Sequence, residues 1–291
     1  MQANQASKPL GKLLTDVINL IRVKQWVKNG FVLAPLLFTG QFTDLASVRN
    51  AAIAFMLFCL ASSASYVVND LKDIERDRLH PKKAKSRPLA AGSMTPAFAR
   101  LVLASIYAML IAGFFLAPSV MAVIVGYLVL NLAYTFFLKH QPVIDIFTIA
   151  IGFVLRVLAG AIALNAPVSG WMFVTTLCLA LYLAAIKRGQ ELSQRGTGGR
   201  EVLTKYTKAL VDKYAEMSAT CALVFYSMFV MESRPELIIT VPLVLFGLFR
   251  YWYVVERLGA GESPTDALLS DLPLLATVVA WVAVCGIVLY A

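Results

Sequence analysis

The amino-acid sequence predicts an all-α, polytopic membrane protein, because its composition is apolar and its apolar residues form long stretches. Of the 291 residues, 59% are hydrophobic and 15% are charged, and the mean hydropathy is +0.73. A soluble domain carries about 25% charged residues, so an ordinary soluble protein is excluded. The four cysteines stand singly in apolar segments, which indicates packed thiols rather than disulfides or a metal cluster.

A bilayer span needs about 20 mostly apolar residues, and we predict about nine spans after a polar N-terminal tail over residues 1–16. The tail lacks the short apolar core that is typical of a signal peptide. The predicted spans are 17–39, 50–69, 97–117, 119–138, 143–164, 170–187, 211–231, 236–256 and 268–290. Two connections, 70–96 and 188–210, are long and basic, whereas most of the others are short.

The basic connections predict the orientation of the chain. Residues 72–87 hold seven lysines and arginines and residues 187–208 hold six, against Arg49 and Arg234 on the opposite side. Because cytoplasmic loops are enriched in Lys and Arg, the N terminus and both long loops are predicted to be cytoplasmic. The net charge of +9 follows largely from this asymmetry, so no nucleic-acid partner is needed to explain it.

Two predicted spans carry polar groups at unusual depth. The polar start of the first span, including Lys24 to Asn29, has three possible interpretations: snorkelling side chains, an interfacial helix over 12–22, or the lining of a cavity. We favour the interfacial helix for the start of the span and cavity lining for residues 24–29. The fifth span holds Asp145 and Arg156, which are about 16 Å apart along a helix. They are therefore too distant for an ion pair, and each indicates a functional site.

The most informative segment, residues 69–81, directly follows the second predicted span. Asp70, Asp73 and Asp77 stand at i, i+3 and i+7, so a helix places their carboxylates on one stripe. Such oxygen ligands suit Mg²⁺ shared with substrate phosphates. A solvated helix end with scattered charge is the alternative, but the bases that crowd residues 82–87 argue against it. Acids for a metal beside bases for phosphate predict a diphosphate site.

These residues resemble the UbiA superfamily of intramembrane prenyltransferases, whose first acidic motif, NDxxDxxxD, is matched from Asn69 to Asp77. The resemblance is closest to one branch, the decaprenyl-phosphate phosphoribosyltransferases. Its longer motif is matched by Arg78, His80, Pro81, Lys83, Arg87, Pro88, Ala90 and Gly92. The resemblance implies one domain over residues 1–291, a helical bundle around a central cavity, and loops 70–96 and 188–210 that cap the active site.

One departure from the wider superfamily bears on the substrate. Members that act on aromatic rings carry a second acidic motif between spans six and seven, whereas this chain has Lys187, Arg188 and Glu191 there. Bases in place of acids favour a bare phosphate over a metal. The resemblance therefore implies 5-phosphoribosyl 1-diphosphate as the donor, a polyprenyl phosphate such as decaprenyl phosphate as the acceptor, and Mg²⁺ as the cofactor.

The predicted site residues fall into three groups. The metal ligands are Asp70, Asp73 and Asp77, and the catalytic group is Asn69, Asp73 and Asp77. The substrate-binding residues are Lys24, Lys28, Asn69, Lys83, Arg87, Arg156, Lys187, Arg188 and Glu191. Lys187 and Arg188 are expected at the 5-phosphate, with Glu191 orienting them or meeting a ribose hydroxyl. His80 is either a base or a helix-terminating contact, and we favour the contact.

The resemblance further implies a multi-pass protein of the bacterial cytoplasmic membrane with a cytoplasmic active site, and it permits a homotrimer. Two other functions remain open. An aromatic prenyltransferase of the same fold would use prenyl diphosphate, but the missing second acidic motif argues against it. A transporter would also tolerate charges within its spans. However, we find no convincing internal repeat, and the acidic motif lies at the end of a span rather than at its middle.

Overall fold

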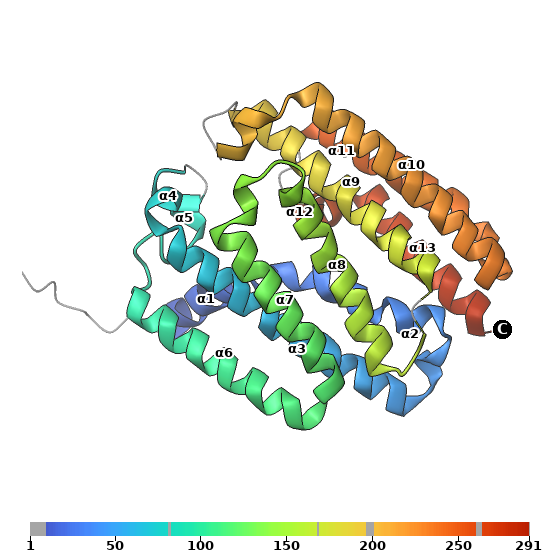
Figure 1. The fold of residues 1–291 in the computed structure, drawn as a ribbon, viewed down its shortest axis with the longest axis horizontal. Coiled ribbons are helices and arrows are strands. Elements are labelled where there is room, and N and C mark those ends of the chain that lie inside the picture. Colours follow the sequence, from blue (N-terminus) through green and yellow to red (C-terminus); the bar gives the residue numbers. More distant parts are fainter. Residues whose placement is uncertain (1–9, 81–82, 168, 196–200, 260–263, 291) are drawn as a thin grey trace, which may run out of the picture.

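The computed structural model describes residues 10–80, 83–167, 169–195, 201–259 and 264–290, which form helices and connections without a β-strand (Figure 1). Eight helical segments are long and apolar enough to cross a membrane. They are α3 (Leu45–Lys72), α6 (Pro96–Leu116), α7 (Pro118–Phe136), α8 (Ile144–Ala163), α9 (Gly170–Arg195), α10 (Lys208–Ser233), η5 (Pro235–Thr240) with α11 (Val241–Leu258), and α13 (Leu272–Tyr290). The predicted all-α membrane fold is confirmed, and these eight coincide with the second to ninth predicted spans.

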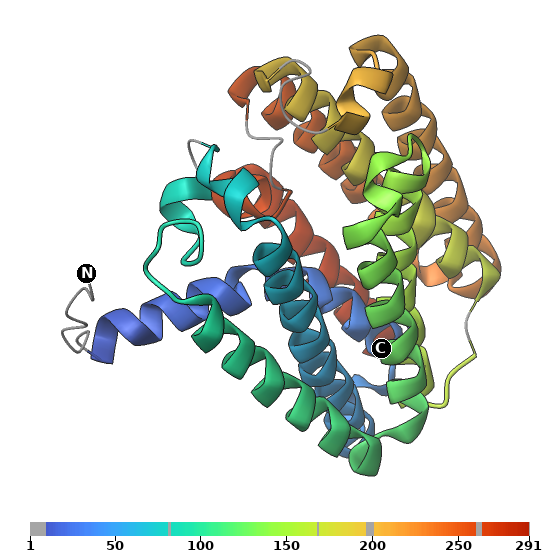
Figure 2. The same cartoon turned by 60° about the vertical axis from the view of Figure 1, so that its left-hand side comes forward.

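The first predicted span, 17–39, is interrupted rather than continuous. It comprises α1 (Leu10–Ile21), the 3₁₀-helix η1 (Val23–Leu33) and α2 (Ala34–Phe38). Arg22, at the break, has a left-handed φ of 54° and binds Asp70, whereas Phe38 accepts a hydrogen bond from Arg234 at the opposite end of the bundle. The segment therefore passes through the bundle from one end to the other, and α1 extends outward from it (Figure 2). Long 3₁₀ stretches are uncommon and often mark functional positions.

A glycine brings η1 close to α8. A Cβ atom on Gly160 would lie 1.9 Å from the carbonyl oxygen of Val32, so a larger residue would push the two segments apart. This close approach carries the polar groups of η1 into the middle of the bundle, where Asn29 reaches Arg156 of α8.

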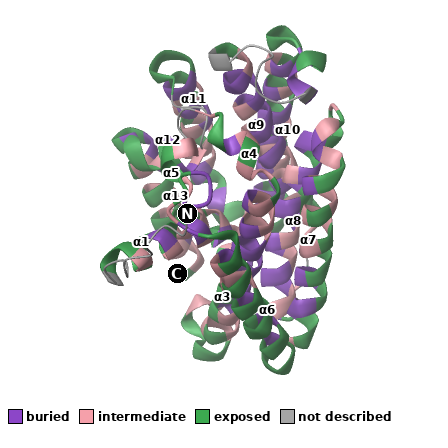
Figure 3. Ribbon diagram, turned by 90° about the vertical axis from the view of Figure 1, so that its left-hand side faces the viewer, coloured by how far each residue is buried: buried purple, intermediate pink, exposed green. Residues whose placement is uncertain are grey.

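The buried side chains form separate clusters on the two sides of the bundle. One cluster joins α3, α6 and α7, and another joins α9, α10 and α11. Figure 3 shows buried residues on the inward faces and exposed residues on the outer faces. The outer residues include large apolar side chains such as Phe115, Leu272 and Ile287, which suit a hydrocarbon environment because lipid tails are as apolar as they are.

The two predicted cytoplasmic loops contain helical structure. Residues 70–96 include the last residues of α3 followed by α4 (Ile74–Arg78) and α5 (Lys83–Ser86), whereas α9 continues through the second predicted loop as far as Arg195 and is followed by η4 (Glu201–Lys205). The prediction that residues 188–195 form a loop is therefore wrong, because this segment is rich in helix-forming residues. Shorter helices are η2 (Gln41–Thr43), η3 (Leu138–His140) and α12 (Pro264–Ser270).

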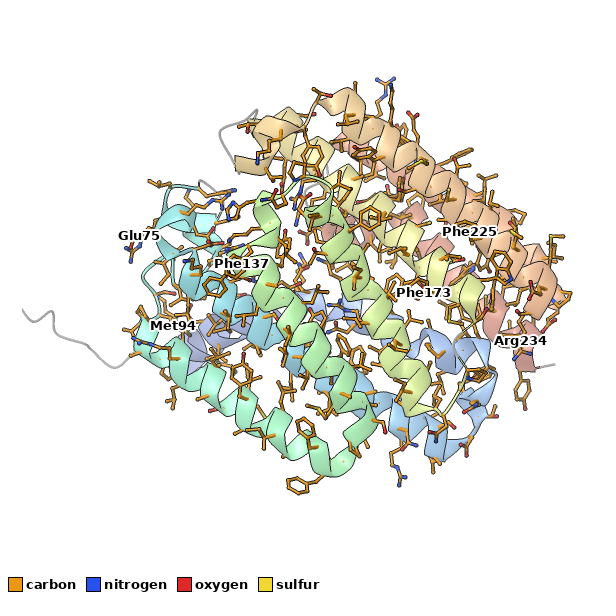
Figure 4. All side chains as sticks on the ribbon, in the orientation of Figure 1. Glu75, Met94, Phe137, Phe173, Phe225 and Arg234 are labelled. Atoms are coloured by element: carbon orange, nitrogen blue, oxygen red, sulfur yellow. The ribbon has the colours of Figure 1, made fainter. Side chains whose placement is uncertain are left out.

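One apolar cavity of about 270 Å³ lies between α8 and α9. Its lining residues are Val154, Val157, Leu158, Phe173 and Thr176. Phe173 is labelled in Figure 4, away from the aspartate end of α3. None of the predicted site residues lines this cavity, so the central cavity implied by the resemblance stays a prediction.

Candidate active site

The first candidate site lies where α3 meets α4. The helix is interrupted at Asp73, which lies between the two elements, so the predicted single stripe of three carboxylates is wrong. Asp70 and Asp77 are both buried and nevertheless converge, because Nη1 of Arg87 binds the carboxylates of both, at 3.0 Å from Asp70. Asp73 is set apart from them: its two oxygens each lie 3.2 Å from Nζ of Lys139 in η3.

Bases surround these three aspartates. The guanidinium of Arg22 binds Asp70 and lies 4.5 Å from the centre of the Tyr66 ring, while Nζ of Lys83 lies 3.3 Å from Asp77. Burial, together with the nearby charge of Arg22, lowers the pKa of Arg87. The group still carries its charge at neutral pH, because the ordinary pKa of arginine lies above about 12. The site therefore holds acids and bases in nearly balanced numbers.

The donor atoms of this site fit Mg²⁺ only in part. Among the described residues, no three His, Cys, Asp or Glu side chains stand together in a way that could hold a metal ion. Asp70 and Asp77 nevertheless bind the same nitrogen of Arg87. This positively charged nitrogen shows that the space between the two carboxylates favours a cation. Mg²⁺ commonly uses one or two carboxylates together with substrate phosphates. The residues thus fit a magnesium ion bound jointly with a phosphate group.

The second candidate site lies on the last turns of α9, around a buried arginine. The Nε of Arg188 donates to Asp145 at 2.6 Å, Nη1 donates to Glu191 at 2.6 Å, and Nη2 donates to the hydroxyl of Tyr134 at 3.1 Å. Only 1% of the Arg188 side chain is exposed. Its partners thus occupy all three guanidinium nitrogens, whereas the neighbouring Lys187 is only partly buried.

Tyr206 completes this second group. Its hydroxyl donates to Asp145 at 2.7 Å and accepts from the backbone N–H of Val143, whose φ of 67° is left-handed. Burial raises the pKa of Tyr206, so the hydroxyl stays protonated and remains a donor at neutral pH. No sequence pattern singles out Tyr206, because a tyrosine near a membrane boundary ordinarily indicates an interfacial position.

The remaining predicted residues lie in three places. Lys24 is 65% exposed and pairs with Asp266 of α12 at 2.6 Å, and its place in the lining of a cavity stays a prediction. Arg156 is buried in the middle of α8, where it binds Asn29 rather than Asp145. Lys28 is partly buried on η1, and Asn69 is partly buried one residue before Asp70.

His80 contributes a helix contact. Its Nδ1 accepts the backbone N–H of Lys83 at 3.3 Å, at the first residue of α5. The contact is made to the start of the following helix, so the predicted helix-terminating contact is wrong.

The two candidate sites are joined through one short segment. Tyr134, in the last turn of α7, contacts Arg188 of the second site, and Lys139, five residues later in η3, contacts Asp73 of the first. A bundle of membrane-length helices with two linked groups of acids and bases at one end defines an integral, multi-pass membrane protein with an ionic site.

The chain belongs to the UbiA prenyltransferase family, which residues 31–269 match. It is 33% identical to the decaprenyl-phosphate phosphoribosyltransferase of Mycobacterium tuberculosis, over 98% of each chain. The protein of the same name from Corynebacterium glutamicum is also 33% identical, over 97% of this chain and 89% of the relative. A solved UbiA homolog from Archaeoglobus fulgidus, bound to GPP and Mg²⁺, aligns with a TM-score of 0.73 at 20% identity, covering 95% of this chain and 100% of that one.

Proposed function

We propose that this protein transfers 5-phosphoribose from 5-phosphoribosyl 1-diphosphate to a polyprenyl phosphate such as decaprenyl phosphate, and releases diphosphate. One observation carries the proposal: the acidic first site is linked through Tyr134 and Lys139 to a second site with Lys187 and Arg188 on α9. A donor with a diphosphate at one end and a phosphate at the other matches a first site with three aspartates among bases and a second site that includes Lys187. The names of the full-length relatives support the same reaction.

The transfer needs little proton chemistry. A phosphate monoester is already anionic near pH 7, so its attack requires no strong general base. An oxygen of the lipid phosphate forms a bond to C1 of ribose, the bond from C1 to the diphosphate oxygen breaks, and its electron pair leaves with diphosphate. The main task of the protein is therefore to stabilise the charge of the departing diphosphate.

The first site is suited to that task. Lys83 and Arg87 hold the diphosphate, and Asn69 donates a hydrogen bond to the ribose or the diphosphate. Asp70, Asp73 and Asp77 would hold Mg²⁺ together with the diphosphate, and the ion would neutralise the charge of the leaving group. The bound Mg²⁺ of the Archaeoglobus fulgidus homolog supports the use of a divalent ion.

The second site receives the other end of the donor. Lys187 contacts the 5-phosphate. Arg188 acts as a positioning residue, because its guanidinium is already bound by Asp145, Glu191 and Tyr134. Glu191 holds Arg188 in place and is close enough in sequence to Lys187 to orient it.

A transfer assay tests this function. Purified protein in lipid nanodiscs receives radiolabelled 5-phosphoribosyl 1-diphosphate with polyprenyl phosphates of several lengths, and a parallel sample receives prenyl diphosphate with 4-hydroxybenzoate. We expect label in the lipid fraction and released diphosphate in the first sample only. Prenylation of 4-hydroxybenzoate without phosphoribosyl transfer would replace the proposal by the aromatic prenyltransferase alternative.

We also propose that the aspartate end of the bundle faces the cytoplasm of a bacterial cell, where a soluble phosphoribosyl donor is made. In a variant without the native cysteines, Glu75→Cys should resist an impermeant thiol reagent in intact cells, whereas Ser233→Cys at the opposite end should react. Glu75 is 83% exposed, so its replacement is accessible from its own side. Labelling of Glu75→Cys from outside would reverse this orientation. The homotrimer stays a prediction.

A further inference from the structure

Two positively charged side chains in the middle of the bundle lack an acidic partner. At the first site Arg22, Lys83 and Arg87 each bind an aspartate, and Arg188 binds two carboxylates at the second. In the part of the chain that the structure describes, Lys28 and Arg156 form no ion pair. Uncompensated charges within membrane spans are costly and mark the paths or sites of charged ligands.

Arg156 is fixed in place by neutral groups. Its Nε donates to Asn29 at 2.8 Å, Nη1 donates to the carbonyl of Gly152 at 2.7 Å, and Nη2 donates to the hydroxyl of Tyr127 at 3.1 Å. The rings of Phe58 and Phe153 also lie 5.4 and 5.1 Å from the guanidinium carbon. Only 5% of this residue is exposed. The protein thus holds a rigid positive charge in its interior without neutralising it.

Lys28 adds a second charge, one residue before the asparagine that binds Arg156. It precedes Asn29 on η1, and Asn29 is held to α3 by hydrogen bonds to Cys59 and Ser62 at 3.2 and 3.1 Å. The charge of Lys28 is repelled by Arg156 and by Arg22, and it is attracted by Asp266. Asp266 already pairs with Lys24. An anion beside Lys28 and Arg156 would relieve this repulsion.

The depth of these two residues favours a lipid-borne anion. Lys28 follows Arg22, which binds Asp70, by six residues, or about 12 Å along a 3₁₀-helix. Arg156 lies about 16 Å along α8 from Asp145 of the second site. Arg156 therefore lies within a helix long enough to cross a membrane, and Lys28 lies on the segment that passes through the bundle, both further from the bundle's end than the aspartates.

We propose that Lys28 binds the phosphate of the polyprenyl phosphate acceptor, at a subsite separate from the donor site, and that the buried charge of Arg156 attracts this phosphate without contacting it. This inference rests on the proposed function, because it takes the acceptor to be a lipid phosphate. Lys28 makes the direct contact, and Arg156 is the fixed charge that favours a phosphate nearby. The acceptor oxygen then approaches the donor from the side of the bilayer, while the donor diphosphate stays at the aspartates.

Binding measurements without turnover test this subsite. Protein in nanodiscs is titrated with decaprenyl phosphate and with decaprenol, which has the same tail and no phosphate. The wild type should prefer the phosphate form at least about tenfold, and Lys28→Gln should reduce that preference by about tenfold or more, because a charge-assisted contact is lost. Lys28→Arg should restore most of it. Lys213→Gln, which removes an exposed lysine on α10, should leave it unchanged.

Three outcomes would overturn the subsite. An unchanged preference in Lys28→Gln would place the phosphate elsewhere. A loss of 5-phosphoribosyl 1-diphosphate binding equal to the loss of decaprenyl phosphate binding would assign Lys28 to the donor. Equal competition by inorganic phosphate or by phosphatidic acid would show a general anion site. Because none of these measurements needs transfer, the subsite can survive or fail independently of the proposed reaction.

Discussion

The two groups of acids and bases at the aspartate end of the bundle are built in opposite ways. At the first site Asp70 and Asp77 are bound by bases that are partly exposed, with exposed fractions of 17% for Arg87 and 27% for Lys83. At the second site one arginine, 1% exposed, is bound by two carboxylates and by the hydroxyl of Tyr134. The first site can exchange its internal partners for a ligand, whereas the second is already satisfied. We therefore assign the leaving diphosphate to the first site. At the second site the bonds of Arg188 hold the end of α9, which also carries Lys187.

The largest effect is expected at the exchangeable site. Asp73→Asn should reduce turnover by at least about a hundredfold, because it weakens the charge that would hold Mg²⁺ and the leaving diphosphate. The fold should survive, since Asp73 is the most exposed of the three aspartates. Turnover of wild type and variant, with and without EDTA, measures this.

Asp212→Asn on α10 is the matched control for that substitution, because it removes a carboxylate that pairs with Lys208 outside both sites. It should keep wild-type turnover. Full activity of Asp73→Asn, or of the wild type in excess EDTA, would show that the reaction does not depend on a metal ion at the aspartates.

Substitutions at the second, enclosed site should mainly lower the stability of the protein. Arg188→Met leaves Asp145 and Glu191 buried without their cation, so the free energy of unfolding should fall by about 3–5 kcal/mol. Lys187→Met, one residue earlier and partly buried, should lower it far less. Unfolding in mixed micelles by increasing fractions of sodium dodecyl sulfate compares the two variants. Equal stability of the two would mean that the Arg188 pairs are not what holds this end of the bundle.

A smaller loss is expected at the edge of the enclosed site. Tyr206→Phe removes a hydrogen bond to Asp145 and leaves the N–H of Val143 without its acceptor, which should cost about 1.5–3 kcal/mol of stability. Tyr253→Phe, at a half-exposed position, is the control and should be nearly neutral. If both tyrosine variants unfold alike, the bond from Tyr206 to Asp145 contributes nothing.

The sequence predicts the helices and the residues of the candidate site better than it predicts which side chains contact one another. Eight spans and the acidic motif follow from hydropathy and spacing, which are local properties. The break at Asp73 and the interruption at Arg22 do not, because each depends on a tertiary contact: Lys139 holds Asp73, and Asp70 holds Arg22. The spacing of eleven residues predicts that Asp145 and Arg156 form no ion pair, and this prediction is confirmed: Asp145 binds Arg188, and Arg156 binds Asn29.

The contacts of the second site could not be predicted from the sequence, for a related physical reason. Asp145 binds Arg188, which is 43 residues away on the next helix, and helix pairing across a bundle leaves no periodic signal in one sequence. The sequence predicts a phosphate partner for Arg188 because bases stand where other family members carry a second acidic motif. The burial of Arg188 follows only from the continuation of α9 to Arg195.

The central claim is that the two sites hold opposite ends of one donor, with Lys187 at the 5-phosphate. The most direct test is the ratio of kcat/KM for 5-phosphoribosyl 1-diphosphate to that for ribose 1-diphosphate, in the wild type and in Lys187→Ala. We predict that the wild type strongly prefers the phosphorylated donor and that Lys187→Ala lowers this preference by about tenfold to a hundredfold, as expected for the loss of one charge-assisted contact. The same preference in both proteins would contradict the claim and place the 5-phosphate away from the end of α9.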